Sequence, residues 1–99
     1  MTADEFTATL QDAHAPAGVP PGLLALWLDG RGDWNGAHET AQEIETPVGA
    51  WIHAYLHRKE GDDGNAAYWY SRASKPVCRL TLQDEWRQIV SALLLTASD

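Results

Sequence analysis

Residues 47–74 read PVGAWIHAYLHRKEGDDGNAAYWYSRAS and contain the clearest structural pattern in the chain. Apolar residues recur there every three or four positions, which is the spacing of one face of a helix. These residues are Val48, Trp51, Ile52, Tyr55 and Leu56. Pro47 is well placed at the first position of a helix, and Gly61 is a typical stop. Asp62 or Asp63 is suited to cap a following helix, so the stretch predicts two helices joined by a tight Gly-Asp turn.

A similar unit precedes this one at an offset of 29 residues, which is 61 minus 32. With that offset Gly32 falls on Gly61, and the residues on either side again have helical spacing. Asp33 or Asn35 is suited to cap the second helix of this earlier unit. The sequence therefore predicts two αα-hairpins, one over residues 21–45 and one over residues 47–74.

One further helix is predicted on each side of the two hairpins. Thr2 and Glu5 have the spacing of a capping box, which predicts a helix over residues 3–14. A last helix is predicted over residues 81–96, and its apolar face contains Leu82, Trp86, Ile89, Val90 and Leu93. Residues 1–99 should thus form a single all-α domain of about six helices, with a capping helix at each end of the hairpin pair.

The second hairpin resembles units of the tetratricopeptide and Sel1-like repeat superfamily. The resemblance rests on Ala50 and Ala54, on Glu-Gly-Asp at 60–62, and on AAYWYSRA at 66–73. The run HAYLHRKEGD is also similar to a run in small bacterial and fungal proteins, a similarity that implies no activity.

The repeat resemblance covers residues 21–74 and implies a right-handed helical repeat that binds a protein or peptide. Two units are fewer than the roughly three that such arrays need. The end helices must therefore act as caps, or a second copy must complete the array as a homodimer.

The composition and net charge of the chain argue against several classes of function. Fourteen acidic residues against seven basic ones give a formal charge of −7, which argues against nucleic-acid and anionic-membrane binding. We expect the acids at helix starts, in turns and on outer faces, where they would favour a basic partner segment. No apolar stretch approaches the ~20 residues of a membrane span, and no secretory signal is evident, so a cytoplasmic protein is expected.

Three histidines are candidate metal ligands. His53 and His57 lie one helical turn apart, and His38 belongs to the helix expected to pack beside theirs. Zinc or another divalent transition metal would suit this set, with Glu39 or water as a fourth ligand. Ala54 stands where a hydrolytic HExxH motif has its glutamate, and no other catalytic motif is present, so the chain is expected to be non-enzymatic.

Two interpretations of the histidines remain open. The repeat alignment puts His53 and His57 in slots that face the neighbouring helix, whereas the helical projection puts them opposite the apolar face, in solvent. A middle helix has neighbours on both sides, and we therefore favour partial burial. Structural or surface histidines without a ligand are the alternative to a metal site.

Three other residues are candidates for binding a partner. Trp34 lies at a helix start, and Tyr68 lies off the apolar face of its helix, one turn from Arg72. Aromatic residues beside arginine are good anchors in interfaces. The leading hypothesis is a non-enzymatic helical-repeat module for protein interaction, and the alternative is a metal- or small-ligand-binding protein that uses the three histidines.

Overall fold

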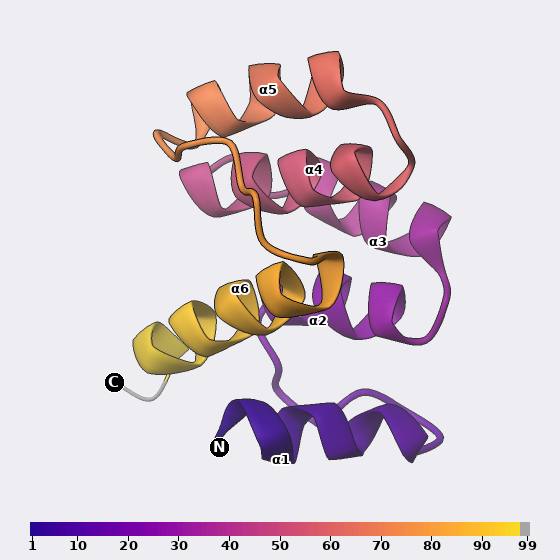
Figure 1. Cartoon of the computed structure of the whole chain (residues 1–99). Helices are drawn as coiled ribbons and strands as arrows, with labels where there is room; N and C mark the ends of the chain where they lie inside the picture. The colour runs from indigo at the N-terminus through magenta and orange to yellow at the C-terminus, as the bar shows by residue number, and fades with distance from the viewer. Residues whose placement is uncertain (98–99) are drawn as a thin grey trace.

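Six α-helices follow one another along residues 1–97, the part of the chain that the computed structural model describes (Figure 1). They are α1 (Ala3–Ala8), α2 (Pro21–Gly30), α3 (Trp34–Gln42), α4 (Pro47–Lys59), α5 (Asp63–Arg72) and α6 (Leu82–Ala97), with a short 3-10 helix, η1 (Thr9–Gln11), after α1. No strand occurs within these residues. The predicted all-α class with about six helices is confirmed.

The two hairpins repeat each other in their turns. Helix α2 packs on α3 and α4 packs on α5, while α3 and α4 lie side by side (Figure 1). Gly32 and Gly61 have φ angles of 85° and 88°, a region that glycine adopts without strain. The side chains of Asp33 and Asp62 then accept hydrogen bonds from backbone N–H groups of α3 and α5. The internal repeat is therefore present in the structure, with an aspartate cap in each copy.

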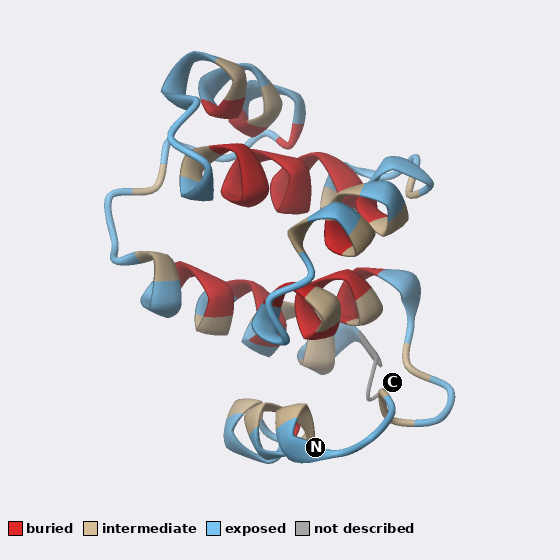
Figure 2. Ribbon diagram, turned by 90° about the vertical axis from the view of Figure 1, so that its right-hand side faces the viewer, coloured by how far each residue is buried: buried red, intermediate tan, exposed pale blue. Residues whose placement is uncertain are grey.

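The end helices close the hairpin pair. Helix α6 packs on α2 and α4, and α1 packs on α6. The indole N–H of Trp86 donates to the carbonyl of Leu26 at 2.9 Å, and the Trp86 ring lies 6.0 Å from that of Phe6. Figure 2 shows the buried residues on the facing sides of the inner helices. The C-terminal cap begins and ends within a residue of its predicted bounds.

The predicted N-terminal helix is too long. Its Thr2–Glu5 capping box is present, but helical structure ends at Gln11, not at residue 14. Asp12 is extended, and its carbonyl accepts a hydrogen bond from Arg31. Residues 12–14 are exposed and gain nothing from packing, so the helix has no reason to continue.

Two acids lie in the core, which corrects the expectation that all acids are outside. Asp29 accepts hydrogen bonds from Tyr55 and Lys59, each at 2.9 Å. Glu85 is fully buried, pairs with Arg58 at 2.8 Å, and accepts from the hydroxyl of Tyr70. Buried carboxylates persist when paired in this way, and here they join α2, α4, α5 and α6.

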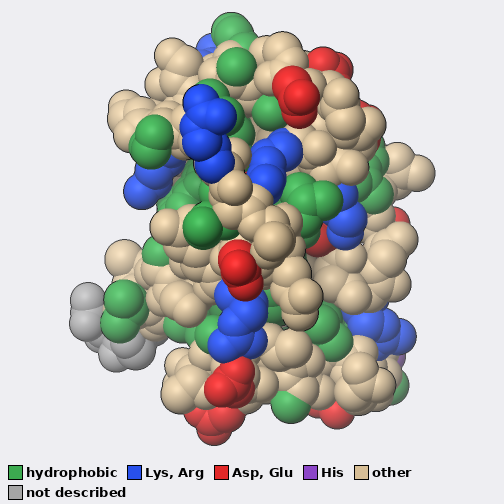
Figure 3. Space-filling view, in the orientation of Figure 1, with side chains coloured by type: hydrophobic (Ala, Val, Ile, Leu, Met, Phe, Trp, Pro, Cys, Tyr) green, Lys and Arg blue, Asp and Glu red, His purple; other side chains and the backbone are tan. Residues whose placement is uncertain are grey.

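Charge on the surface is mixed even though the net charge is −7. The face that carries the 73–81 connection displays Lys and Arg side chains interspersed with Asp and Glu (Figure 3). Among the described helices, none combines the length and apolar character required to cross a bilayer.

Candidate metal centre

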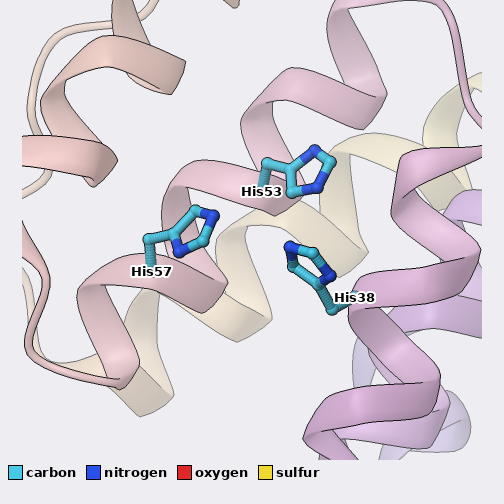
Figure 4. Close-up of side chains that lie close together, drawn as sticks. All are labelled: His38, His53 and His57. Carbon is cyan, nitrogen blue, oxygen red and sulfur yellow. The ribbon is translucent and has the colours of Figure 1, made fainter.

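The three predicted histidines meet between α3 and α4. His38 reaches from α3 toward His53 and His57 on α4, and the three rings share one space (Figure 4). The ring centroid of His38 lies 4.7 Å from that of His53 and 5.4 Å from that of His57. One ligating atom from each residue lies within 4.8 Å of the other two. Sequence spacing identified this cluster correctly.

A close approach of the backbone brings α3 to α4. Gly49, in the first turn of α4, lies against the connection from α3, and a Cβ at this position would overlap the carbonyl oxygen of Ile44 in that connection. Ala37 and Ala41 on α3 are fully buried, and their short side chains allow neighbouring helices to pack close to α3. The tight connection fixes the start of α4 relative to the end of α3, and His38 lies against the α4 histidines.

Two tryptophans pack against the cluster. The ring of Trp69 stacks on His53 with centroids 4.3 Å apart, and that of Trp34 stacks on His38 at 5.0 Å. The indole N–H of Trp34 donates to the carbonyl of Leu56 at 3.0 Å, which fixes the ring in place. Trp34, predicted as a partner anchor, is half-buried and packs against the histidines.

Burial favours the neutral form of His38 and His53. His53 is 5% exposed, and burial, followed by the nearby His38 and His57, lowers its pKa to about 4. The pKa of His38 is also lowered, first by burial and then by His57, against smaller opposing effects of Glu60 and Glu39. The predicted burial is confirmed, and the solvent-facing interpretation is wrong. Neutral imidazole is the form that binds a metal ion.

Glu60 orients one of the rings. Its carboxylate accepts a hydrogen bond from Nδ1 of His57 at 2.7 Å, which leaves Nε2 as the nitrogen with a free lone pair. A carboxylate behind a histidine in this way is a common feature of metal sites, because it fixes the tautomer. The contact of Glu60 with His57 was not predicted, although Glu60 stands three residues after His57 on the same helical face.

Within residues 1–97, neither His38 nor His53 forms a hydrogen bond through its ring. No buried side-chain nitrogen or oxygen lacks a partner in the described chain, so these unpaired ring nitrogens are accessible from the pocket that the histidines line. The expected fourth ligand Glu39 is not part of the described group of converging ligand atoms. The protein therefore offers three nitrogen ligands.

A second group of potential ligands shares His57 with the first. It consists of His57, Glu60 and Asp62, and both acids are exposed. Asp62 already caps α5, and Glu60 already accepts from the His57 ring. The buried cluster of three histidines is therefore the stronger candidate.

The cluster opens on a pocket of about 650 Å³ bounded by α3, α4 and α5. Besides the histidines, its polar lining includes Gln42, Glu45, Asn65 and Arg72. Arg72 was predicted to bind a partner together with Tyr68, and it donates to the Tyr68 hydroxyl at 3.0 Å. Tyr68 is 53% exposed. Two of the three predicted partner residues thus lie together on α5, whereas Trp34 contacts the cluster from α3.

No family model, curated protein or solved structure matches the chain.

Proposed function

We propose that this protein binds one divalent transition-metal ion, with zinc as the reference, through His38, His53 and His57. The observation that carries the proposal is the convergence of three buried or half-buried imidazoles whose ligating atoms lie within 4.8 Å of one another. Nitrogen ligands of a tetrahedral zinc ion are ~3.3 Å apart, because each Zn–N bond is about 2.0–2.1 Å long. Small side-chain rotations would close the difference.

The number of ligands distinguishes the kind of site. Structural zinc ions have four protein ligands, whereas ions that interact with a substrate or ligand keep one position open. Three histidines beside a 650 Å³ pocket fit the second arrangement, with water or a ligand in the fourth position. This favours a ligand-binding metal protein over a purely structural zinc domain.

Thermal unfolding and zinc stoichiometry test the proposal. At a free zinc concentration 100 times its Kd, binding should stabilise the fold by about 2.7 kcal/mol. For a chain of this size that stabilisation corresponds to a rise in Tm of roughly 10–20 °C. Chelator should reverse the shift, and equilibrium dialysis should give one zinc ion per chain.

Histidine variants supply the matched control. We expect His38→Ala to lower zinc affinity by ~100-fold or more, because only two ligands remain. His14→Ala removes the fourth, exposed histidine and should leave affinity unchanged. Zinc that fails to shift the Tm, or that binds equally to both variants, would show that the cluster is not a metal site.

A protein-interaction module of the tetratricopeptide or Sel1-like type is the second candidate. The repeated turns support it, as does the exposed Tyr68 ring beside Arg72. The acidic net charge favours a basic peptide as the partner. Fluorescence polarisation with Lys/Arg-rich and Glu-rich peptides tests this candidate. Tyr68→Ala should lose binding of the basic set, and unchanged binding would argue against the surface.

A further inference from the structure

The pocket in front of the histidines also contains a cationic side chain, Arg72, at its α5 wall. From this arrangement we propose that the metal-loaded pocket binds a small dicarboxylate, with one carboxylate on the ion and the other on Arg72. The inference rests on the proposed metal site and names the class of ligand that the site takes.

The pocket is larger than the ion requires. One water molecule occupies about 30 Å³ in the liquid, so a 650 Å³ pocket leaves room well beyond a metal-bound water. Its volume falls in the range of small-molecule sites, roughly 300–1,000 Å³. A ligand that only filled the fourth coordination position would leave most of this space to solvent.

Arg72 is held in position but keeps its charge available. Its guanidinium carbon lies 5.5 Å from the ring centroid of Trp69 and 5.7 Å from that of Tyr68. One of its N–H groups donates to the Tyr68 hydroxyl. No acid within residues 1–97 forms an ion pair with it, in contrast to Arg58 with Glu85. A guanidinium restricted in this way is suited to bind a carboxylate in a bidentate manner.

The charge at the pocket becomes more positive when the ion binds. Glu45 and Arg72 are the charged side chains among the described residues that line the pocket, and their charges cancel while the histidines are neutral. A divalent ion then adds two positive charges at the point where a ligand would bind, and Glu60 behind His57 and Glu39 near His38 offset part of that charge from outside the lining. Acids on distant surfaces act weakly here, since the Debye length is about 8 Å at physiological ionic strength. The loaded pocket should therefore select a dianion even though the whole protein is acidic.

The polar groups that line the pocket are also suited to a carboxylate ligand. Carboxylate oxygen is a normal zinc ligand and would complete a tetrahedral set with the three imidazoles. The side-chain amides of Gln42 and Asn65 line the same pocket and can donate to further ligand oxygens. A dicarboxylate would thus meet complementary groups on the α3, α4 and α5 sides.

Cobalt spectroscopy on the full chain provides the experiment. Co²⁺ takes the place of zinc, and its visible absorption bands report a change in coordination. The Co²⁺-loaded protein is titrated with acetate and with a series of dicarboxylates from malonate to adipate. We expect at least one dicarboxylate to alter the bands and to bind about tenfold or more tightly than acetate, because a charge-assisted pair with Arg72 is added.

Two arginine variants distinguish the contact of Arg72 with the ligand from the effect of the protein's net charge. Arg72→Gln should weaken dicarboxylate binding at least about tenfold while leaving acetate binding nearly unchanged. Arg79→Gln removes the same charge from an exposed position outside this pocket and should bind as the wild type does.

The possible failures are distinguishable. Bands that do not change on adding dicarboxylate to the Co²⁺ protein, or equal binding by the two variants, would overturn the ligand inference alone. Failure of Co²⁺ to bind would overturn the proposed metal site, and the ligand inference with it.

Discussion

His53 is the residue on which the site most depends. It is buried, stacks on Trp69, and faces His38 and His57, while neither of its nitrogens has a hydrogen-bond partner within the described chain. Its spacing to His57 was visible in the sequence, because residues four apart share a helical face. Its partial burial was expected because α4 has neighbours on both sides, but its stacking on Trp69 from the next helix was not.

The metal-free protein should lose stability as the pH falls through the range in which His53 would titrate. The pKa of His53 is lowered from 6.5 to about 4 on folding, so the unfolded chain binds the proton more tightly. The contribution of neutral His53 to the unfolding free energy is therefore complete above about pH 6.5. It is lost progressively as the pH falls to about 4, by up to ~3 kcal/mol.

Urea unfolding between pH 7 and pH 4 in the presence of chelator measures this effect. His53→Gln removes the titrating group, and the fall in unfolding free energy over that range should become shallower than in the wild type. Parallel pH profiles for the two proteins would mean that His53 is not held in its neutral form by the fold.

At the scale of elements, the crossing of α3 and α4 builds the site. The helices themselves were predictable, because each begins with a cap or a proline and has apolar residues at helical spacing. The role of Glu60 behind His57 was not recognised, although both belong to one turn. The role of Trp34 depends on where α3 meets α4, which no local pattern reports.

Gly49→Ala should separate α3 from α4. A Cβ at Gly49 would overlap a backbone carbonyl, which cannot rotate away as a side chain does. We expect a loss of about 1–3 kcal/mol in unfolding free energy and weaker zinc binding, because His38 moves away from its partners.

Gly64→Ala is the matched control for that variant. Gly64 lies in the first turn of α5 with open space around it, so alanine should be neutral or stabilising by up to ~1 kcal/mol. Chemical denaturation and zinc competition on both variants measure the contrast. Equal effects would show that the close approach at Gly49 does not position the site.

Across the whole molecule, ion pairs with buried carboxylates join the two hairpins to each other and to the C-terminal helix. Arg58 and Lys59 are neighbours at the end of α4, yet they pair with Glu85 on α6 and Asp29 on α2. Local patterns place acids at the surface, so these partners were not predictable without the tertiary fold. Helix α6 packs on α2 and α4 and α1 packs on α6, whereas capping of both ends of the array and pairing with a second copy stay predictions.

Glu85→Ala should destabilise the protein by about 1–3 kcal/mol, because it leaves the buried Tyr70 hydroxyl without its partner and removes the carboxylate that pairs with the half-buried Arg58. Asp4→Ala breaks the exposed Asp4–Arg87 pair and should cost less than about 1 kcal/mol. Urea denaturation of the two variants gives both values, and a small loss for Glu85→Ala would mean that the buried pair does not hold α6 in place.

X-ray absorption at the zinc edge examines the ion itself in the stoichiometrically loaded full chain. The three-histidine site predicts three imidazole nitrogens at about 2.0–2.1 Å, with one further oxygen ligand from water or a small molecule. A sulfur ligand at about 2.3 Å, which only Cys78 or Met1 could supply, or a shell of oxygens alone, would contradict the site.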